Sequence, residues 1–186
     1  MKAVIIGVSD RSILWRYGRL KKEEYQNFVD SYSDALSGMF DNVIVTPDDG
    51  VYTDIAKEFG RKTGKKPIAY YPDKDERFGY GHLDLKNFEA KKINGDWYKL
   101  NAELVTKAGV VICTGISPGS MIELSYIKYH QKHNNQKIKL FVDLRCIEKP
   151  LPPSFEEQID NLTYFENFDE LKRQIKKEFS LKDFFC

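Results

Sequence analysis

The sequence predicts an α/β fold with a doubly wound, mostly parallel sheet flanked by helices. Short apolar runs rich in β-branched residues recur along the chain, as is typical of strands that are covered on both faces. Segments with apolar residues at helical spacing separate these runs. Strands that alternate with helices form parallel sheets, because each helix carries the chain back across the sheet. The length of 186 residues fits one domain, which we assign to residues 1–186.

The individual elements follow from these two patterns. The apolar runs predict strands at Lys2–Val8, Asn42–Thr46, Pro67–Tyr71, Val110–Thr114, Lys137–Leu144 and Leu162–Phe165. The helical spacing predicts helices over Leu20–Phe40, Thr53–Lys62, Tyr98–Lys107, Pro118–His133 and Phe168–Phe179. Nearly every strand is thus followed by a helix, which is the order that a parallel sheet requires.

The segment Pro72–Asp96 interrupts this order with Pro, Gly, Asp and Lys residues. Within it, the pair Asn94-Gly95 predicts a hairpin turn. Loops of this length inside a compact domain are usually functional or mobile. The aromatic residues of Phe78–His82 alternate with glycines that can act as hinges, so we expect a lid that orders over a ligand.

Composition excludes several classes of function. The chain has 29 Lys and Arg against 28 Asp and Glu, a net charge of +1, which argues against a nucleic-acid partner or a membrane surface. No stretch approaches the ~20 apolar residues of a membrane span, and Met1–Val8 is too short for a signal peptide. An odd number of cysteines without a CxxC pair predicts reduced thiols and a cytoplasmic protein: Cys113, Cys146 and Cys186.

The three histidines, His82, His130 and His133, could in principle bind a metal ion. No cysteine or second carboxylate joins them at the spacing of metal ligands, so surface histidines are the better interpretation. We therefore expect no metal and no cofactor.

In doubly wound sheets the ligand binds beyond the carboxyl ends of the strands, where the strand order reverses. The candidate turns are those that follow the first, second and fourth strands. The first contains Gly7, Ser9 and Asp10, and the second is Pro47–Gly50. The third follows Val110–Thr114 and leads into the helix that begins at Pro118.

This third turn has the composition of an anion site. Ser117 suits the N-cap of the helix, and Pro118 suits the first helical position because its missing N–H would be unpaired there. Gly119 and Ser120 leave the N–H groups of the first turn open to an anion. Glu123 shares their helix face, so a sugar attached to a bound phosphate would pass this carboxylate. The alternative is a capped helix on which Glu123 is a solvated acid.

A group of cations and aromatics follows the first strand. Arg11 and Arg16 flank Trp15, with Tyr17 and Arg19 close behind. Near the expected crevice, such residues could hold a phosphate and stack on a base. The alternative is a solvated helix start with one aromatic residue in the core.

The stretch TGISPGSMIEL resembles the PGGxGTxxE motif of the lonely-guy (LOG) phosphoribohydrolases and of the wider Rossmann-like superfamily around them. Gly119, Ser120 and Glu123 match the second half of the motif. Gly115 stands at the position of the motif's proline, and Ile116 and Ser117 replace its paired glycines. The resemblance implies a Rossmann-like fold with Glu123 as the catalytic residue.

Weaker similarity extends over most of residues 3–179. It covers the turn Ile6–Ser9, the helix start Gly50–Ala56, the loop Tyr71–Asp75 and the element Leu100–Leu104. The family's arginine before Asn101 is Leu100 here, and Lys99 lies one position away. The ligand-binding residues that the turns and the resemblance together indicate are Gly7, Ser9, Gly50, Asn101, Gly115, Ser117, Gly119 and Ser120.

The resemblance implies binding of a nucleotide or sugar phosphate and cleavage or transfer of an N-glycosidic bond. Nucleoside 2-deoxyribosyltransferases are more distantly similar, and there Asp48 and Asp49 would lie near sugar hydroxyls. The family's arginine acts together with the motif glutamate, so Leu100 favours the alternative of a noncatalytic nucleotide-binding or sensing module. Family members pair through the helices that flank the motif, and we expect a homodimer through the apolar surface of Met121, Ile122, Tyr126 and Tyr129.

Overall fold

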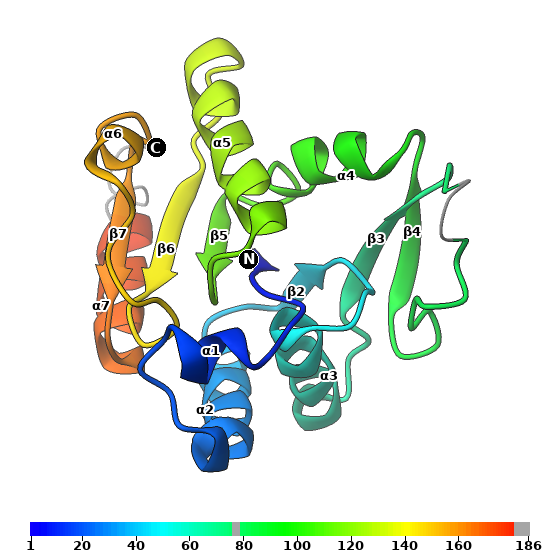
Figure 1. Ribbon diagram of the computed structural model, residues 1–186, viewed down its shortest axis with the longest axis horizontal. Helices are drawn as coiled ribbons and strands as arrows, with labels where there is room; N and C mark the ends of the chain where they lie inside the picture. Colours follow the sequence, from blue (N-terminus) through cyan, green and yellow to red (C-terminus); the bar gives the residue numbers. More distant parts are fainter. Residues whose placement is uncertain (76–78, 181–186) are drawn as a thin grey trace.

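The computed structural model describes residues 1–75 and 79–180. Seven parallel strands form one sheet in the order β4-β3-β2-β1-β5-β6-β7 (Figure 1). Their bounds are β1 Lys2–Ile6, β2 Asn42–Val45, β3 Ile68–Pro72, β4 Glu89–Ile93, β5 Val110–Cys113, β6 Lys139–Asp143 and β7 Leu162–Phe165. The α/β class and the doubly wound sheet are confirmed, and the described sheet is parallel throughout.

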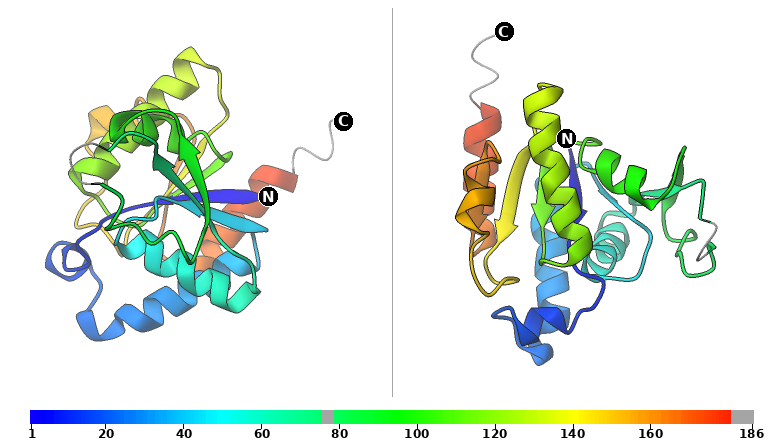
Figure 2. Two further views of the ribbon diagram at one scale, coloured as in Figure 1. Left: turned by 90° about the vertical axis from the view of Figure 1, so that its right-hand side faces the viewer. Right: turned by 45° about the horizontal axis from the view of Figure 1, so that its top comes forward.

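Helices cover both faces of the sheet (Figure 2). Their bounds are α1 Ile13–Arg16, the 3-10 helix η1 Lys22–Glu24, α2 Tyr25–Ser37, α3 Val51–Thr63, α4 Trp97–Leu104, α5 Pro118–His133, α6 Pro153–Glu156 and α7 Phe168–Ser180. One core lies between the sheet and α2, α3 and α7, and a second lies between the sheet and α4 and α5. Successive residues of β1 divide between them, since Ala3 and Ile5 join the first core and Val4 and Ile6 the second.

The direction of the winding reverses at β1. From β1 the chain runs through β2 and β3 to β4 at one edge of the sheet, and β5, β6 and β7 then extend the other side. Strands β1 and β5 are neighbours, with Val4 opposite Val111 and Ile6 opposite Cys113. The turns that leave these two strands separate toward opposite faces, which opens a crevice at their carboxyl ends.

The predicted hairpin at Asn94-Gly95 is wrong. The residues before it form β4, which pairs in parallel with β3, from Ile68 opposite Glu89 to Pro72 opposite Ile93. The chain then enters α4, and the side chain of the N-cap residue Asp96 accepts a hydrogen bond from the backbone N–H of Lys99. Asn-Gly pairs suit several kinds of turn, and here the pairing of β4 with the parallel strand β3 excludes a hairpin.

The expected loop Pro72–Asp96 is shortened by β4 at its carboxyl end. The ring of Tyr80 meets the ring of Tyr71 edge-on, and the imidazole of His82 lies 6.0 Å from the indole of Trp97. Phe78, within the predicted lid Pro72–Asp96, lies outside the described residues. Among the residues that are described, none of the helices has the length and apolar character needed to cross a bilayer.

Candidate functional site

A pocket of about 160 Å³ lies at the carboxyl end of β1, where the strand order reverses. We call it the switch-point pocket. Three turns and three helices meet there, and its lining consists of Ile5, Ile6, Gly7, Ser9, Thr46, Asp48, Tyr52, Trp97, Asn101, Ser117, Gly119, Ser120 and Glu123. The fold thus brings together seven of the residues that the sequence indicates: Gly7, Ser9, Asn101, Ser117, Gly119, Ser120 and Glu123.

One wall of the pocket is the first turn of α5. The side-chain oxygen of Ser117 accepts a hydrogen bond from the backbone N–H of Ser120 at 3.2 Å, and the N–H of Ser117 donates to the Ser120 hydroxyl at 2.7 Å. This capping box satisfies two donors, and Pro118 has none. Within the described part of the chain, the N–H of Gly119 is left without an acceptor. It is therefore available to a ligand.

Gly119 is open to solvent and does not need to be glycine for the fold. A Cβ atom at this position would meet nothing nearer than the Ser117 side-chain oxygen at 3.8 Å. Gly7 differs, because a Cβ there would lie 2.3 Å from the Thr114 hydroxyl. Close packing of two turns therefore accounts for Gly7. At Gly119 the missing side chain instead keeps the start of the helix accessible.

Glu123 lies one turn further along α5, and its carboxyl group is buried inside the pocket. The residue is only 7% exposed. No hydrogen bond or ion pair reaches its side chain from the residues that the structure describes. Burial raises the pKa of the Glu123 carboxyl to about 8. The group therefore keeps its proton at neutral pH, and the interpretation of Glu123 as a solvated surface acid does not fit.

A second buried acid, Asp143 at the end of β6, has the hydrogen-bond partners that Glu123 lacks among the described residues. It is fully buried, and it accepts bonds from the backbone N–H, Nε and Nη2 of Arg145 at 2.9, 2.9 and 2.7 Å. Buried charges normally have such partners. Glu123 has none among the described residues, so its burial has no structural explanation within the chain.

The opposite wall carries hydroxyl, amide and carboxylate groups. The Tyr52 hydroxyl lies 3.4 Å from the hydroxyl of Ser9. Burial raises the pKa of Tyr52 to about 12, and the negative charges of Asp48 and Glu123 act in the same direction. The side-chain amide of Asn101 has no hydrogen-bond partner among the described residues, which leaves both ends of the amide to a ligand.

Trp97 closes the pocket from the start of α4. Its indole N–H donates to the carboxylate of Asp75 at 2.8 Å, so the ring is held between the β3–β4 connection and the pocket. An aromatic face of this kind offers a flat apolar surface to a sugar or a base.

The switch-point pocket contains acidic groups and, in its described lining, no cation. Asp48 and Glu123 line it, the latter protonated at neutral pH, and no Lys, Arg or His is among the described lining residues. Leu100, at the position of the family's arginine, is fully buried in the core, and Lys99 is exposed beside Glu103 at 3.7 Å. Across residues 1–75 and 79–180, no three His, Cys, Asp and Glu side chains gather as a metal site. Any phosphate must therefore rely on neutral N–H and hydroxyl donors.

The three residues predicted to contact a base or phosphate lie outside the described lining of the pocket. Arg11 is bound to Asp54 through Nε and Nη2, at 2.5 and 2.8 Å, and to Asp49 at 3.0 and 2.7 Å. It therefore ties the turn after β1 to the start of α3. Arg16 pairs with Asp10 at 2.7 Å. Trp15 packs against the core, with its ring edge-on to Tyr25.

Gly50 and Gly115 are also absent from the described pocket lining. Gly115 has a φ of 138°, which disfavours any other residue, and a Cβ there would lie 3.0 Å from Val8. At Gly50 a Cβ would lie 2.9 Å from the carbonyl oxygen of Val8. Both glycines therefore allow the turns around β1 to pack closely.

Three polar or aromatic lining residues were missed by reasoning from the sequence: Thr46, Tyr52 and Trp97. Thr46 ends the second apolar run and Tyr52 follows the turn Pro47–Gly50, so the position of that turn was the signal that could have found them. Trp97 stands at the start of α4 after a strand that the apolar pattern did not reveal.

No protein-family model matches the chain, and no curated protein matches its sequence. Solved structures do resemble it. The molybdenum cofactor binding protein of the phototrophic bacterium Rippkaea orientalis has a TM-score of 0.61 and 14% identity, covering 96% of both chains. The protein TM1055 has a TM-score of 0.61 and 19% identity, covering 95% of this chain and 98% of the other.

DNA processing protein A from Helicobacter pylori, which binds single-stranded DNA, has a TM-score of 0.58 and 15% identity. The match covers 96% of this chain and 81% of that protein. At identities this low, the likeness shows the fold alone. The chain therefore has a Rossmann-like α/β fold, which it shares with proteins of differing function.

Proposed function

We propose that the chain binds a nucleotide or sugar phosphate in the switch-point pocket. The observation that carries this proposal is the buried carboxyl of Glu123, which has no partner among the described residues and lies one turn after the open N–H of Gly119. A buried polar group without a partner costs free energy, so a ligand that supplies the missing hydrogen bond recovers part of that cost. The reversal of strand order at this point is where doubly wound folds bind ligands.

The charges of the pocket support one orientation of the ligand. The hydroxyls of a sugar ring can bond to Glu123, Asp48 and Asn101, because carboxylate and amide oxygens accept hydroxyl protons. A phosphate fits best beside the exposed Gly119, where the helix dipole of α5 favours an anion, whereas Glu123 is buried. A base attached to the sugar would then extend toward Trp97.

Glu123 is also suited to cleavage of an N-glycosidic bond. A carboxyl that is protonated at neutral pH can donate its proton to a leaving base, and in its ionised form it stabilises an oxocarbenium-like transition state. This chemistry is what the resemblance to the LOG family implies. We propose it as the reaction of the site if the bound ligand is a nucleoside monophosphate.

A noncatalytic binding protein is the second candidate, and one observation favours it. Where the LOG family has an arginine, this chain has the buried Leu100. The described lining of the pocket holds no cation that could assist Glu123. Among the structures of similar fold, the protein from Chlamydomonas reinhardtii is a molybdenum cofactor carrier protein. Such a carrier role needs binding but no turnover.

Two variants separate these candidates. Gly119→Asp is expected to weaken binding of nucleoside monophosphates by about tenfold or more, because its carboxylate occupies the anion's place at the helix start. Glu123→Gln keeps the shape of the side chain, so binding persists while cleavage falls by about 10²-fold. Thermal shift with AMP, GMP, CMP and UMP measures binding, because a ligand at 100 times its Kd adds about 2.7 kcal/mol. Release of free base measures cleavage.

Gly119→Ala is the matched control, since a methyl group meets no close neighbour there, and it should bind like the parent chain. Binding without base release in any form supports the carrier. If both Gly119→Asp and Glu123→Gln bind all four nucleotides as the parent does, the α5 turn is only a helix cap and the proposal fails.

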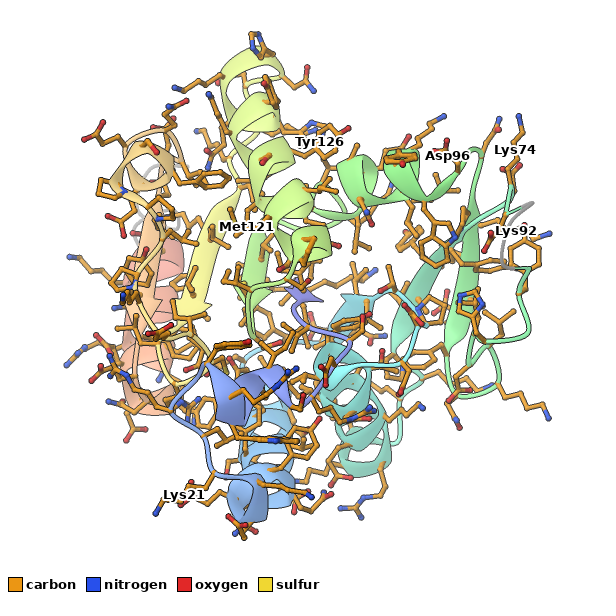
Figure 3. The ribbon with its side chains drawn as sticks, in the orientation of Figure 1. Lys21, Lys74, Lys92, Asp96, Met121 and Tyr126 are labelled. Carbon is orange, nitrogen blue, oxygen red and sulfur yellow. The ribbon has the colours of Figure 1, made fainter. Side chains whose placement is uncertain are left out.

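We also propose a homodimer through α5. Ile122 and Tyr129 are 38% and 51% exposed, whereas Met121 and Tyr126, labelled on α5 in Figure 3, pack partly against the core. Burying the two exposed side chains against a second copy removes apolar surface from water. Ile122→Asp/Tyr129→Asp should therefore convert a dimer into a monomer in multi-angle light scattering. A parent chain that is already monomeric at micromolar concentration would contradict the proposal.

A further inference from the structure

A second hollow, of about 460 Å³, lies at the amino ends of β3 and β4, whereas the switch-point pocket lies at the carboxyl end of β1. We call it the basic hollow. It is formed where α3 ends and the chain approaches the amino ends of β3 and β4 (Figure 1). Its described lining holds five cations and no acid: Lys57, Arg61, Lys65, Lys66 and Lys86, with Gly60, Gly64, Pro67 and Asn87 between them.

Two of the five cations are neutralised by carboxylates. Lys57 pairs with Asp84 at 2.7 Å, and Arg61 pairs with Glu58 at 2.5 Å one turn earlier on α3. These two contribute hydrogen-bond donors to the rim but little net charge.

The other three cations are exposed and form no ion pair with the described residues. The charge of Lys65 does help to lower the pKa of the Asp41 carboxyl. The ammonium of Lys65 donates to the backbone carbonyl of Asp41 at 3.1 Å, and that of Lys66 donates to the carbonyl of Lys86 at 3.4 Å. The side chain of Lys86 forms no hydrogen bond or ion pair with any residue in the described part of the chain. Three like charges thus converge on one hollow in a chain whose net charge is only +1. Such an arrangement attracts an anion.

The backbone around the basic hollow holds these lysines in place. Gly64 ends α3 with a φ of +68°, the left-handed conformation that turns the chain back toward the sheet. A Cβ at Gly60 would lie 2.9 Å from the ring of Pro67 and 3.0 Å from the carbonyl of Lys65. The Lys65–Lys66 segment is therefore packed against the helix, and both side chains start from a fixed backbone.

We propose that the basic hollow binds a compact polyanion with adjacent phosphate groups, such as a triphosphate. Lysine ammonium groups bind phosphate oxygens through charge-assisted hydrogen bonds, and three of them match the several charges of linked phosphates better than a single carboxylate. The described lining contains no aromatic side chain, and single-stranded nucleic acids need aromatic rings on which their bases stack. The hollow thus recognises phosphates, independently of the ligand of the switch-point pocket.

Isothermal titration of sodium tripolyphosphate into the full chain tests this site. The variant Lys65→Gln/Lys66→Gln/Lys86→Gln is expected to weaken binding by about tenfold or more, through the loss of three charge-assisted contacts. The matched control is Lys132→Gln/Lys137→Gln/Lys149→Gln, which removes the same charge from exposed lysines elsewhere. The control should keep its Kd within about twofold.

Three results would overturn the proposal: no binding by the parent chain, an equal loss in the control variant, or displacement of tripolyphosphate by a DNA duplex at a lower phosphate concentration. The last would make the surface a nucleic-acid interface instead. Gly119→Asp should retain the tripolyphosphate site that the triple lysine variant loses, because Gly119 lies in the other pocket. Loss of binding in that variant would place the anion at the α5 turn and also overturn the proposal.

Discussion

Replacing Glu123 with glutamine is expected to stabilise the protein at pH 9 by up to roughly 5 kcal/mol and to leave its stability at pH 5 nearly unchanged. The Glu123 carboxyl has a pKa of about 8 in the folded protein against an ordinary value of 4.5. Between these values the folded state holds a proton that the unfolded state has released. The stability of the parent chain therefore falls as the pH rises from 4.5 to 8, whereas glutamine stays neutral throughout.

Urea unfolding at pH 5, 7 and 9 measures this difference as a change in the free energy of unfolding. Glu148→Gln is the matched control, since Glu148 is exposed, and it should follow the parent chain at each pH. If Glu123→Gln loses stability between pH 5 and 9 as steeply as the parent chain does, the pKa of Glu123 is not raised by burial. The role proposed for it as a proton donor at neutral pH would then fall as well.

Replacing Arg145 with methionine is expected to destabilise the fold by about 3–5 kcal/mol, because it removes the guanidinium that pairs with the fully buried carboxylate of Asp143 and leaves, among the described residues, only the backbone N–H as a donor. The guanidinium also lies over the ring of Phe168, 4.4 Å from its centroid, and close to Phe28 and Tyr32. Methionine keeps much of the apolar contact with these rings but supplies no charge. The main loss is therefore the ion pair, and urea unfolding at pH 7 measures it.

Arg19→Met is the matched control for this prediction. Arg19 pairs with Glu166 at 3.0 Å, but both side chains are 57% exposed. Pairs of this kind contribute about 0–1 kcal/mol. The double variant Asp143→Asn/Arg145→Met should recover part of the loss, since it removes the unpaired charge. Equal effects of Arg145→Met and Arg19→Met on the free energy of unfolding would show that the buried ion pair contributes no more than the exposed one.

Local chemistry was enough to predict α5. The predicted helix Pro118–His133 has the same bounds in the structure. Its start is set by local residues, because Ser117 caps the helix and Pro118 occupies its first position. The strands of the sheet centre were equally visible, since a strand buried on both faces must be apolar along its whole length. These features depend on neighbours in the sequence or on a single burial environment.

Strand β4 could not be predicted in the same way. Its sequence EAKKI carries three charged side chains, and only Ile93 is buried, as is usual for a strand at the edge of a sheet. The apolar pattern was therefore missing. What stabilises β4 is the ladder of backbone hydrogen bonds to β3, and those bonds depend on a partner about twenty residues earlier in the chain.

For the site, the sequence by itself determined that Gly119, Ser120 and Glu123 share one face of α5, because helical spacing is local. Only the tertiary structure decided that Glu123 is buried without a partner among the described residues, since Tyr52 of α3 and Trp97 and Asn101 of α4 close the pocket.

The same reason explains the outcome for Arg11. Its position after β1 was consistent with a phosphate contact, but folding brings Asp49, in the turn after β2, and Asp54, in the first turn of α3, within hydrogen-bond distance. Periodicity and capping act over a few residues and can be read along the chain. Burial, charge partners and the shape of a pocket depend on segments that only the folded sheet brings together.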